Sequence, residues 1–459
     1  MDEKDQIIAF LKAELEQQKE QIKLLKQEIE ELKELLNRNS KNSSLPPSQD
    51  KSNKQVSKPN KKPRLWRKGY FRKRIPEKDV SLIKDLKPET CDRCGTSNFI
   101  QYKLKEIRQT VEIPPVKPFV TEYRAFSCRC GDCGKELKAC FPAEAHKVFG
   151  PRMRSICTLL ASKFRISKRY IKELFKEFFG VGVSIGSISN FEEEASHILQ
   201  PSWEQAKQDL QKSETVYADE THWKTKKQRQ WLWQACDKQR VVFQIDPKRG
   251  KKAAIKLLGK ESFHNLVTDR WRAYSTLGYH QYCWAHLKRD FKKIEERPGQ
   301  VSLIGSTLGC LCTLLFNLAK EKRSGALTLE QFREKASVLR EEFHYFLSLG
   351  IRIDSAFGKL GRTGRFCERL VAEEDHLWYF INEPSIDLTN NLSERNLRPA
   401  VIWRKVSFGT QSERGNRFVE RILSLVETLK IQKRNAFEFL ANCFQAHMNG
   451  SVVPNFGSM

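Results

Sequence analysis

The fold of this chain is decided by the stretches TVYADE (215–220), QWLWQACD (230–237), VVFQID (241–246), KKAAIKLLG (251–259) and FHNLVTD (263–269). The first three and the last are short runs with alternating or continuous apolar character, which predicts strands. The fourth has the periodicity of a helix. The order of elements is therefore β, β, β, α, β, and YHQYCW can add one more strand.

Three successive strands, a crossover helix and a returning strand are the topology of a ribonuclease H-like domain. In that topology the first and fourth strands lie side by side, so Asp219 and Asp269 become neighbours. The predicted class is multidomain α/β with a ribonuclease H-like catalytic core.

Two neighbouring carboxylates in a basic protein can hold Mg²⁺ (or Mn²⁺), because these ions prefer oxygen ligands. The helical stretch NNLSERNLR (390–398) supplies a third acid, since Asn391, Glu394 and Arg398 share one face by three- and four-residue spacing. Two ions in such a site activate the attacking oxygen and stabilise the leaving one. We expect Asp219, Asp269 and Glu394 to be the catalytic and metal-binding residues.

Other side chains compete for these roles. Glu220 is expected to point to the opposite face of its strand, and Asp246 ends a different strand. His222 and Lys224 are in position to touch DNA. A further cluster follows the second acid and consists of His280, Cys283 and His286. For these three side chains, packing in the protein interior is the favoured interpretation.

Composition points to a nucleic-acid partner and to the cytoplasm. The 459 residues carry 82 Lys and Arg against 56 Asp and Glu, a formal charge of +26 that attracts polyanions. The start MDEKDQ lacks the apolar core of a signal peptide, and thirteen cysteines in such a chain indicate reduced thiols and metal ligands. The apolar stretch Val301 to Ala319 is diluted by polar residues, so a buried helix is favoured over a membrane span.

The N-terminus predicts a coiled coil that joins copies of the chain. Apolar residues recur at three- and four-residue steps, and Glu, Lys and Gln fill most other positions; a lone solvated helix is the alternative. A basic linker follows, in which KKPRLWRKGYFRKR can grip phosphates and stack rings or can simply be solvated. The seam consists of Ile8, Leu11, Leu15, Ile22, Leu25, Ile29, Leu32 and Leu36.

Two CxxCG pairs predict a zinc site. Cys91 and Cys94, with Cys130 and Cys133, offer four thiolates for one tetrahedral Zn²⁺, and the stretches EIRQTVEI and FVTEYRAFSC between them read as strands of a zinc ribbon. Cys128 is a rival for one ligand position.

A helix, a glycine-bearing turn and a second helix beginning near Ser184 are predicted in SKRYIKELFKEFFGVGVSIGSISNFEEEA. If this is a DNA-reading helix-turn-helix, then Ser187, Ser189 and Asn190 reach base edges. A structural helical hairpin is the alternative.

The chain resembles the large transposases of the bacterial insertion-sequence family numbered sixty-six, a branch of the DDE transposases. The resemblance spans nearly the whole length and rests on motifs in the family's order. It departs from the commoner family text after the second acid, where Arg270 and Trp271 stand instead of small residues. The motifs are NSSLPPS, the paired CxxCG, YADETHWK, VTDRWRAY, CWAHLKRDF, LTNNLSERNLRP and SFGTQSERGNR.

The resemblance implies that Asp219, Asp269 and Glu394 take the catalytic positions. It also implies binding of transposon ends and target DNA, cleavage and strand transfer, and accessory proteins of the same element. Around SFGTQSERGNR, phosphate contacts are expected from Arg404, Lys405, Arg414 and Arg417.

In the predicted organisation, one helical insertion divides the core into two parts. The runner-up function is a DNA-binding regulator with an inactive core, and a third is a nuclease acting on RNA in hybrids. The predicted units are a coiled coil (1–38), a basic flexible linker (39–82), a zinc ribbon (83–148), a helix-turn-helix-like region (149–205), the core's first part (206–282), a helical insertion (283–384), the core's second part (385–430) and a C-terminal tail (431–459).

Overall fold

The computed structural model describes residues 3–39, 42–43, 73–260, 265–275, 277–355, 360–383 and 385–457. Most of the predicted linker lies outside these residues, including the leader from Ser44 onward. The same holds for the aromatic and basic stretch around Trp66, Tyr70 and Phe71.

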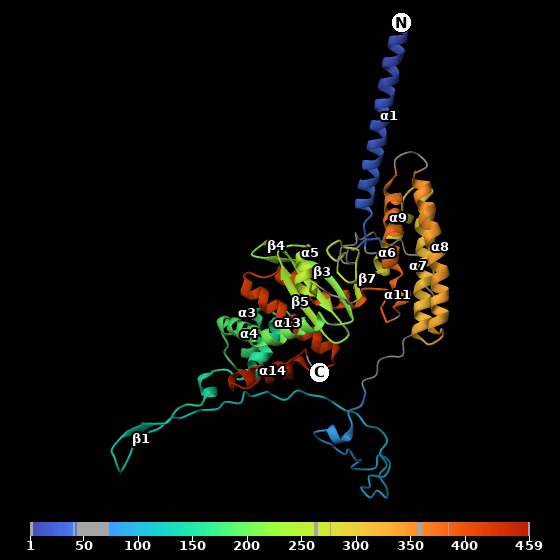
Figure 1. Cartoon of the computed structure of the whole chain (residues 1–459). Coiled ribbons are helices and arrows are strands. Elements are labelled where there is room, and N and C mark those ends of the chain that lie inside the picture. The colour runs from blue at the N-terminus through green and yellow to red at the C-terminus, as the bar shows by residue number, and fades with distance from the viewer. Residues whose placement is uncertain are drawn as a thin grey trace.

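The centre of the molecule is a five-stranded sheet with the order β5-β4-β3-β6-β7 (Figure 1). The pairs β3–β4 and β4–β5 are antiparallel, and the pairs β3–β6 and β6–β7 are parallel. The predicted order of elements is therefore found, with the first and fourth strands adjacent and YHQY forming the fifth. The bounds are β3 Thr215–Thr225, β4 Gln228–Cys236, β5 Val241–Asp246, α5 Lys251–Leu258, β6 Asn265–Thr268 and β7 Tyr279–Tyr282.

Helices cover both faces of this sheet because each strand presents apolar side chains on both sides. On one face Val216, Trp233 and Leu266 pack with α4, α5, α13 and α14. On the other, Tyr217 and Phe243 pack with α12 and α13. The C-terminal helices are α12 Asn391–Ser407, α13 Glu413–Ile431 and α14 Ala436–Met448.

The outer strand β5 is closed by side chains of α13. The amide of Val241 donates to Thr428 Oγ1 (2.9 Å), that of Phe243 to Ser424 Oγ (2.9 Å), and that of Ile245 to Glu420 Oε1 (2.6 Å). These acceptors recur every four residues along the helix and meet alternate residues of the strand. The exposed edge that a strand otherwise offers is thereby satisfied within the chain.

A helical unit precedes the sheet. It consists of α2 Pro151–Ala161, α3 Lys168–Phe179 and α4 Ile185–Leu210, packed around Cys157, Ile171 and Phe175. Gly180 ends α3 with φ +65°, and the Ser184 side chain accepts from the Ser187 amide to begin α4. The predicted helix, turn and second helix are present, but α4 continues to Leu210, past the predicted boundary at 205.

Residues 283–384 are largely helical and have an apolar core of their own. Phe291 of α6, Leu308 of α7 and Phe343 of α8 lie in it. In Figure 1 these helices stand beside the sheet as a separate bundle. They are α6 Trp284–Glu295, α7 Val301–Arg323, α8 Leu329–Ser355, α9 Arg362–Ala372, α10 Glu374–Leu377 and α11 Tyr379–Asn382.

Within the described chain, α7 alone is long and apolar enough to cross a membrane by length and composition. In the structure it is a bundle helix: Ile304, Leu308 and Leu315 are buried against its neighbours, while Leu303 and Leu314 are exposed. The predicted buried helix is thus buried along one face.

The N-terminal helix α1 (Glu3–Leu36) extends away from the rest of the chain (Figure 1). Its described apolar side chains are exposed, for example Leu25 and Leu32. Among its described side chains, those near its end make ion pairs with the rest of the chain: Glu34 Oε1 pairs with Arg297 Nε (2.8 Å) and Arg362 Nη2 (3.0 Å) beside α6 and α9. Pairing of this seam with a second copy stays a prediction.

Two sequence predictions differ from the structure. The stretches 106–113 and 119–126 are described without strand, and a short hairpin, β1 Ser127–Arg129 with β2 Glu136–Lys138, is formed instead. Their apolar side chains, such as Val120, are exposed, and an isolated pair of strands without a layer to cover is only marginally stable.

The second difference is the C-terminus, because 431–459 is not a tail. Helix α14 buries Leu440 and Phe444 against α2 and α4, and Phe456 beyond it is fully buried. The run AFEFLANCF has apolar residues at helical spacing, and these supply part of the core that the sheet needs.

Gly305 offers a test of the bundle. A Cβ at this position would lie 2.3 Å from the backbone nitrogen of Glu295, whereas a Cβ at Gly309 would meet nothing closer than Phe291 Cβ at 4.0 Å. Gly305→Ala should therefore lower the free energy of unfolding by about 1–3 kcal/mol through overpacking. Gly309→Ala should leave it unchanged or raise it by up to about 1 kcal/mol through helix propensity. Urea unfolding curves measure both, and equal effects would contradict the close helix contact.

Candidate active site

Three polar side chains form a row that runs from β3 to the carboxyl ends of β6 and β7. Tyr217 pairs with Val267 between β3 and β6, and two residues further along each strand stand Asp219 and Asp269. Thr268 pairs with Tyr282 between β6 and β7, and the next residues are Asp269 and Cys283. Since paired positions of parallel strands face the same way, Asp219, Asp269 and Cys283 lie in succession on one face.

Asn390 brings the third acid to this row. The side-chain Nδ2 of Asn390 donates to Ala218 O (2.7 Å), and its backbone amide donates to Cys283 Sγ (3.2 Å). Ser393, one turn on, donates its hydroxyl to Gln234 Oε1 of β4. These bonds fix the start of α12 against three strands, and Glu394 is in its first turn.

The three acids act on one another. Burial raises the pKa of Asp219 well above its usual range, and the charges of Glu220, Asp269 and Glu394 raise it further. Burial and the charge of Asp269 also raise the pKa of Glu394, although Arg289 opposes this. Burial raises the pKa of Asp269 against the Trp271 amide and two arginines. Carboxylates gathered in a sheltered place favour a bound cation, so the donor set fits a divalent ion.

The rival acids have other partners. Glu220 is buried, receives hydrogen bonds from Arg249 Nε (2.7 Å) and the Tyr274 hydroxyl, and so belongs to a closed ion pair. Arg249 also stacks on Trp271, 3.9 Å from its centroid. Asp246 Oδ1 accepts from the amide of Lys248 (2.9 Å), which is a turn contact.

Arg270 and Trp271, where the sequence departs from the commoner family text, are built into the structure. The Asp269 carboxylate accepts the Trp271 amide (2.9 Å), and Arg270 pairs with Asp290 of α6 and lies over Phe366 of α9. The loop after β6 therefore joins the sheet to the helical bundle, which explains the large side chains.

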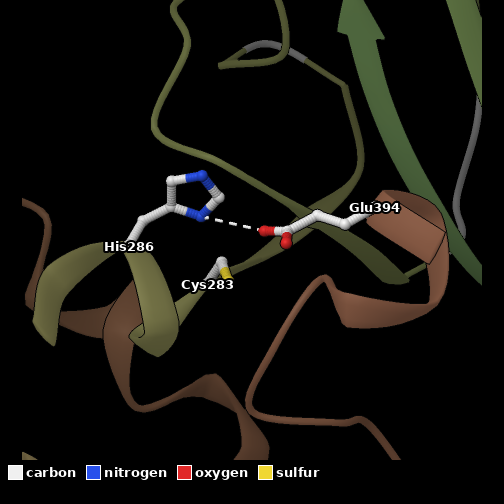
Figure 2. A group of neighbouring side chains, drawn as sticks. All are labelled: Cys283, His286 and Glu394. Atoms are coloured by element: carbon white, nitrogen blue, oxygen red, sulfur yellow. Dashed lines mark ion pairs between the residues drawn. The ribbon is translucent and has the colours of Figure 1, made fainter. Parts of the chain in front are cut away.

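Sequence reasoning missed a feature next to Glu394. Figure 2 shows Cys283 and His286 at the start of α6 facing Glu394 of α12. One ligand atom of each residue lies within 4.8 Å of the others. The CxxH spacing was the available signal, but it does not reveal the partner from α12. His280, by contrast, is buried against Tyr282 and His376, as packing predicts.

Two residues expected to bind phosphate also make contacts within the chain. Arg404 Nη1 donates to Thr221 Oγ1 (2.7 Å) and to the His222 carbonyl, which ties the end of α12 to β3. Arg414 pairs with Glu193 of α4 at 2.9 Å. The Arg414 charge is paired at the surface, whereas these partners of Arg404 are neutral, and phosphate binding by both residues stays a prediction.

The remaining expected DNA contacts lie on the surface. On α12 and α13, Arg398, Lys405 and Arg417 are exposed. At the start of α4, Asn190 is exposed and Ser187 is half-buried, with Ser187 Oγ 2.9 Å from Ser184 Oγ. The Ser189 hydroxyl receives a hydrogen bond from Lys168 Nζ (2.9 Å).

Both cysteine knuckles are formed locally. Gly95 N donates to Cys91 O (2.9 Å), Gly134 N donates to Cys130 O (2.9 Å), and the two glycines have φ +70° and +71°. Neighbouring backbone amides lower the pKa of the Cys91 and Cys130 thiols, which favours metal-binding thiolates. The described residues do not gather both pairs into one four-sulfur group, and Cys128 lies in β1.

Comparison with known families now gives the class of protein. A model described as "Transposase IS66 family" matches residues 148–417, which contain the sheet, the bundle and the three acids. A second, described as "zinc-finger binding domain of transposase IS66", matches 88–134, which contain both knuckles. The chain is a member of the transposases, a class that binds DNA. It belongs to the IS66 family.

Two curated relatives are both from Sinorhizobium fredii. The uncharacterized protein y4qI is 24% identical over 390 residues, covering 78% of this chain and 70% of the relative. The uncharacterized protein y4jO is 28% identical over 155 residues, covering 34% of this chain and 44% of the relative.

The Glu220–Arg249 pair generates a prediction about stability. Removing the arginine leaves a buried carboxylate without its counter-charge, so Arg249→Leu should cost about 2 kcal/mol at neutral pH, less than a fully buried pair because Arg249 is partly exposed. The Glu220 pKa is already raised in the folded state, so the deficit should shrink as pH falls and the carboxyl becomes protonated. Arg229 and Arg249 both lie over the ring of Trp231. Arg229→Leu is therefore the control, because it removes one of these stacked arginines and leaves the Glu220–Arg249 pair intact. Urea unfolding at neutral and at acidic pH measures the loss in the free energy of unfolding. An equal loss at the two pH values would contradict the ion-pair interpretation.

The knuckles generate a second prediction. Segment 88–134 has little buried apolar surface, so its order should depend on zinc. Chelation should speed proteolysis within this segment at least about tenfold while the sheet stays resistant. Cys130→Ser should mimic chelation and Cys128→Ser should not, because only Cys130 lies in a knuckle turn. Cleavage sites mapped by mass spectrometry decide this, and the reverse ranking would make Cys128 the ligand.

Proposed function

We propose that the chain is a DNA transposase that binds the ends of its insertion sequence, cleaves them and transfers them into target DNA by a two-metal-ion DDE mechanism. The observation that carries this proposal is that three acids come from neighbouring elements: Asp219 and Asp269 follow paired positions of β3 and β6, and Asn390 holds to β3 the start of α12, which carries Glu394. The strand order supports interpretation of the core as ribonuclease H-like.

Asp219, Asp269 and Glu394 would hold Mg²⁺ or Mn²⁺ through carboxylate oxygens, the ligands that these ions prefer. When bound, the ions supply activation of the attacking oxygen and stabilisation of the leaving one. The task of the chain is positioning. Asn390 fixes the start of α12, which carries Glu394, and the Trp271 amide orients Asp269.

Other residues would hold the DNA. Arg398, Lys405 and Arg417 present positive charge on the same helices that carry or support Glu394, so they suit the phosphates of a strand leading to the acids. Ser187 and Asn190 at the start of α4 suit base contacts. The cysteines Cys91, Cys94, Cys130 and Cys133 would bind Zn²⁺ and order a second DNA-binding unit.

Assembly and location complete the proposal. The exposed seam of α1 would pair with another copy, giving a homo-oligomer able to hold two ends, and accessory proteins of the same element would assist. The thirteen cysteines are all unpaired in the described structure, in keeping with a reducing cytoplasm.

The catalytic acids give the central test. Asp219→Asn, Asp269→Asn and Glu394→Gln should each lower Mg²⁺-dependent cutting of labelled element-end DNA by at least about 10²–10³-fold, since each removes a carboxylate that would hold the metal ions. DNA binding, measured by gel shift, should persist.

Asp246→Asn is the matched control, because that carboxylate ends a strand away from the row and should retain full cutting. If the wild-type protein binds the DNA but does not cut it, the result would favour a DNA-binding regulator over a transposase. Cutting by Asp269→Asn alone would mean that the second acid is misassigned, and preference for RNA in hybrids would favour the hybrid nuclease.

A further inference from the structure

Apart from the three acids and the cysteine knuckles, Cys283, His286 and Glu394 also form a group that could hold a metal ion (Figure 2). Cys283 precedes α6 and His286 is in its first turn, while Glu394 is in the first turn of α12. The two helix starts are held together by the Asn390 amide, which donates to Cys283 Sγ at 3.2 Å. Ligand atoms from distant parts of the chain therefore meet in a fixed place.

The facing atoms of this group lack hydrogen-bond partners within the described structure. His286 Nδ1 and Glu394 Oε1 are both buried and unpaired, at 3.6 Å from each other. This separation is longer than a hydrogen bond, so neither atom satisfies the other. A neutral ring nitrogen beside a carboxylate oxygen is an arrangement that a metal ion satisfies.

The donor set favours one class of ion. Sulfur, nitrogen and oxygen ligands together suit Zn²⁺, whereas Mg²⁺ takes oxygen. Atoms bound to one zinc at its usual bond lengths lie roughly 3.5 Å apart. The separation of His286 Nδ1 from Glu394 Oε1 is already 3.6 Å, and all three ligand atoms lie within 4.8 Å of one another. Small side-chain rotations complete such a site and leave its fourth position open.

We propose that Cys283, His286 and Glu394 form a Zn²⁺ site that competes with the catalytic Mg²⁺ for Glu394. Cys283 follows Asp269 in the row across the sheet, so Glu394 stands between an all-oxygen group on one side and a sulfur and nitrogen pair on the other. Zinc bound by Cys283 and His286 takes the carboxylate away from the aspartates. The competition rests on the proposed function, whereas zinc binding itself does not.

Arg289 is the charged group nearest to this site, with Nη2 3.9 Å from Glu394 Oε1. It favours the ionised carboxylate, and its side chain is partly exposed, so it can turn toward water when a cation binds. The positive charge of Arg270 is paired with the carboxylate of Asp290, so Arg270 presents no unpaired charge to the site.

The test measures metal directly on the full chain. Purified protein is stripped, reloaded with Co²⁺ as a spectroscopic substitute for Zn²⁺, and titrated while thiolate-to-cobalt absorption is followed. Cys283→Ser should bind one equivalent less than wild type, with weaker thiolate absorption, and Glu394→Gln should bind that equivalent more weakly. Cys310→Ser, which removes an exposed thiol of α7, is the matched control and should equal wild type.

Zinc should raise the melting temperature of the core transition in wild type more than in Cys283→Ser, while the metal-free proteins melt alike. Equal stoichiometry and equal zinc-dependent shifts in these two proteins would overturn the site. Asp219→Asn should keep the extra equivalent while losing cutting, so loss of the enzyme proposal leaves this measurement valid. Zinc that binds without suppressing Mg²⁺-dependent cutting by wild type would overturn the competition.

Discussion

The structure depends on the way Asn390 fastens one helix start to the sheet. Its side chain donates a hydrogen bond to the β3 backbone at Ala218, and its backbone amide donates one to the sulfur of Cys283, between β7 and α6. These two bonds hold the start of α12 against the sheet, and Arg404 ties the other end of the helix to β3. Glu394 stands one turn after Asn390, so its place beside the aspartates depends on this attachment, whereas the register of β3 and β6 sets Asp219 beside Asp269. The buried Ser393–Gln234 contact secures it from the other side.

The closeness of the starts of α6 and α12 also explains how a large helical bundle interrupts the core without disturbing it. The Trp284 amide donates to Leu388 O (3.0 Å), so the chain leaves and re-enters the sheet at neighbouring points. The bundle buries its own apolar residues, and the Arg270–Asp290 pair joins it to the loop that carries Asp269. The bundle and the acids are therefore mechanically connected, although they have separate cores.

Much of this arrangement was available from the sequence, and the limits have physical causes. Short apolar runs separated by turns revealed β3 to β7, and the crossover rule placed Asp219 beside Asp269. The CxxCG pairs revealed the knuckles because local spacing sets that turn. Local pattern did not reveal that Glu394 meets Cys283 and His286, since they are brought together by long-range bonds. It also assigned strands where no partner layer exists, and it missed α14, whose burial depends on α2 and α4.

Closure of β5 by α13 has a consequence for how copies of the protein associate. The hydroxyl and carboxylate groups of Ser424, Thr428 and Glu420 occupy the amides that another strand would otherwise use. At the opposite edge, Gln281 of β7 is engaged by the Leu377 carbonyl and the Phe380 amide. Along β5, these three positions therefore offer no free amides for growth of a continuous sheet from one molecule into the next. A second copy that approached this side of the sheet would meet the helix α13 instead of an open strand.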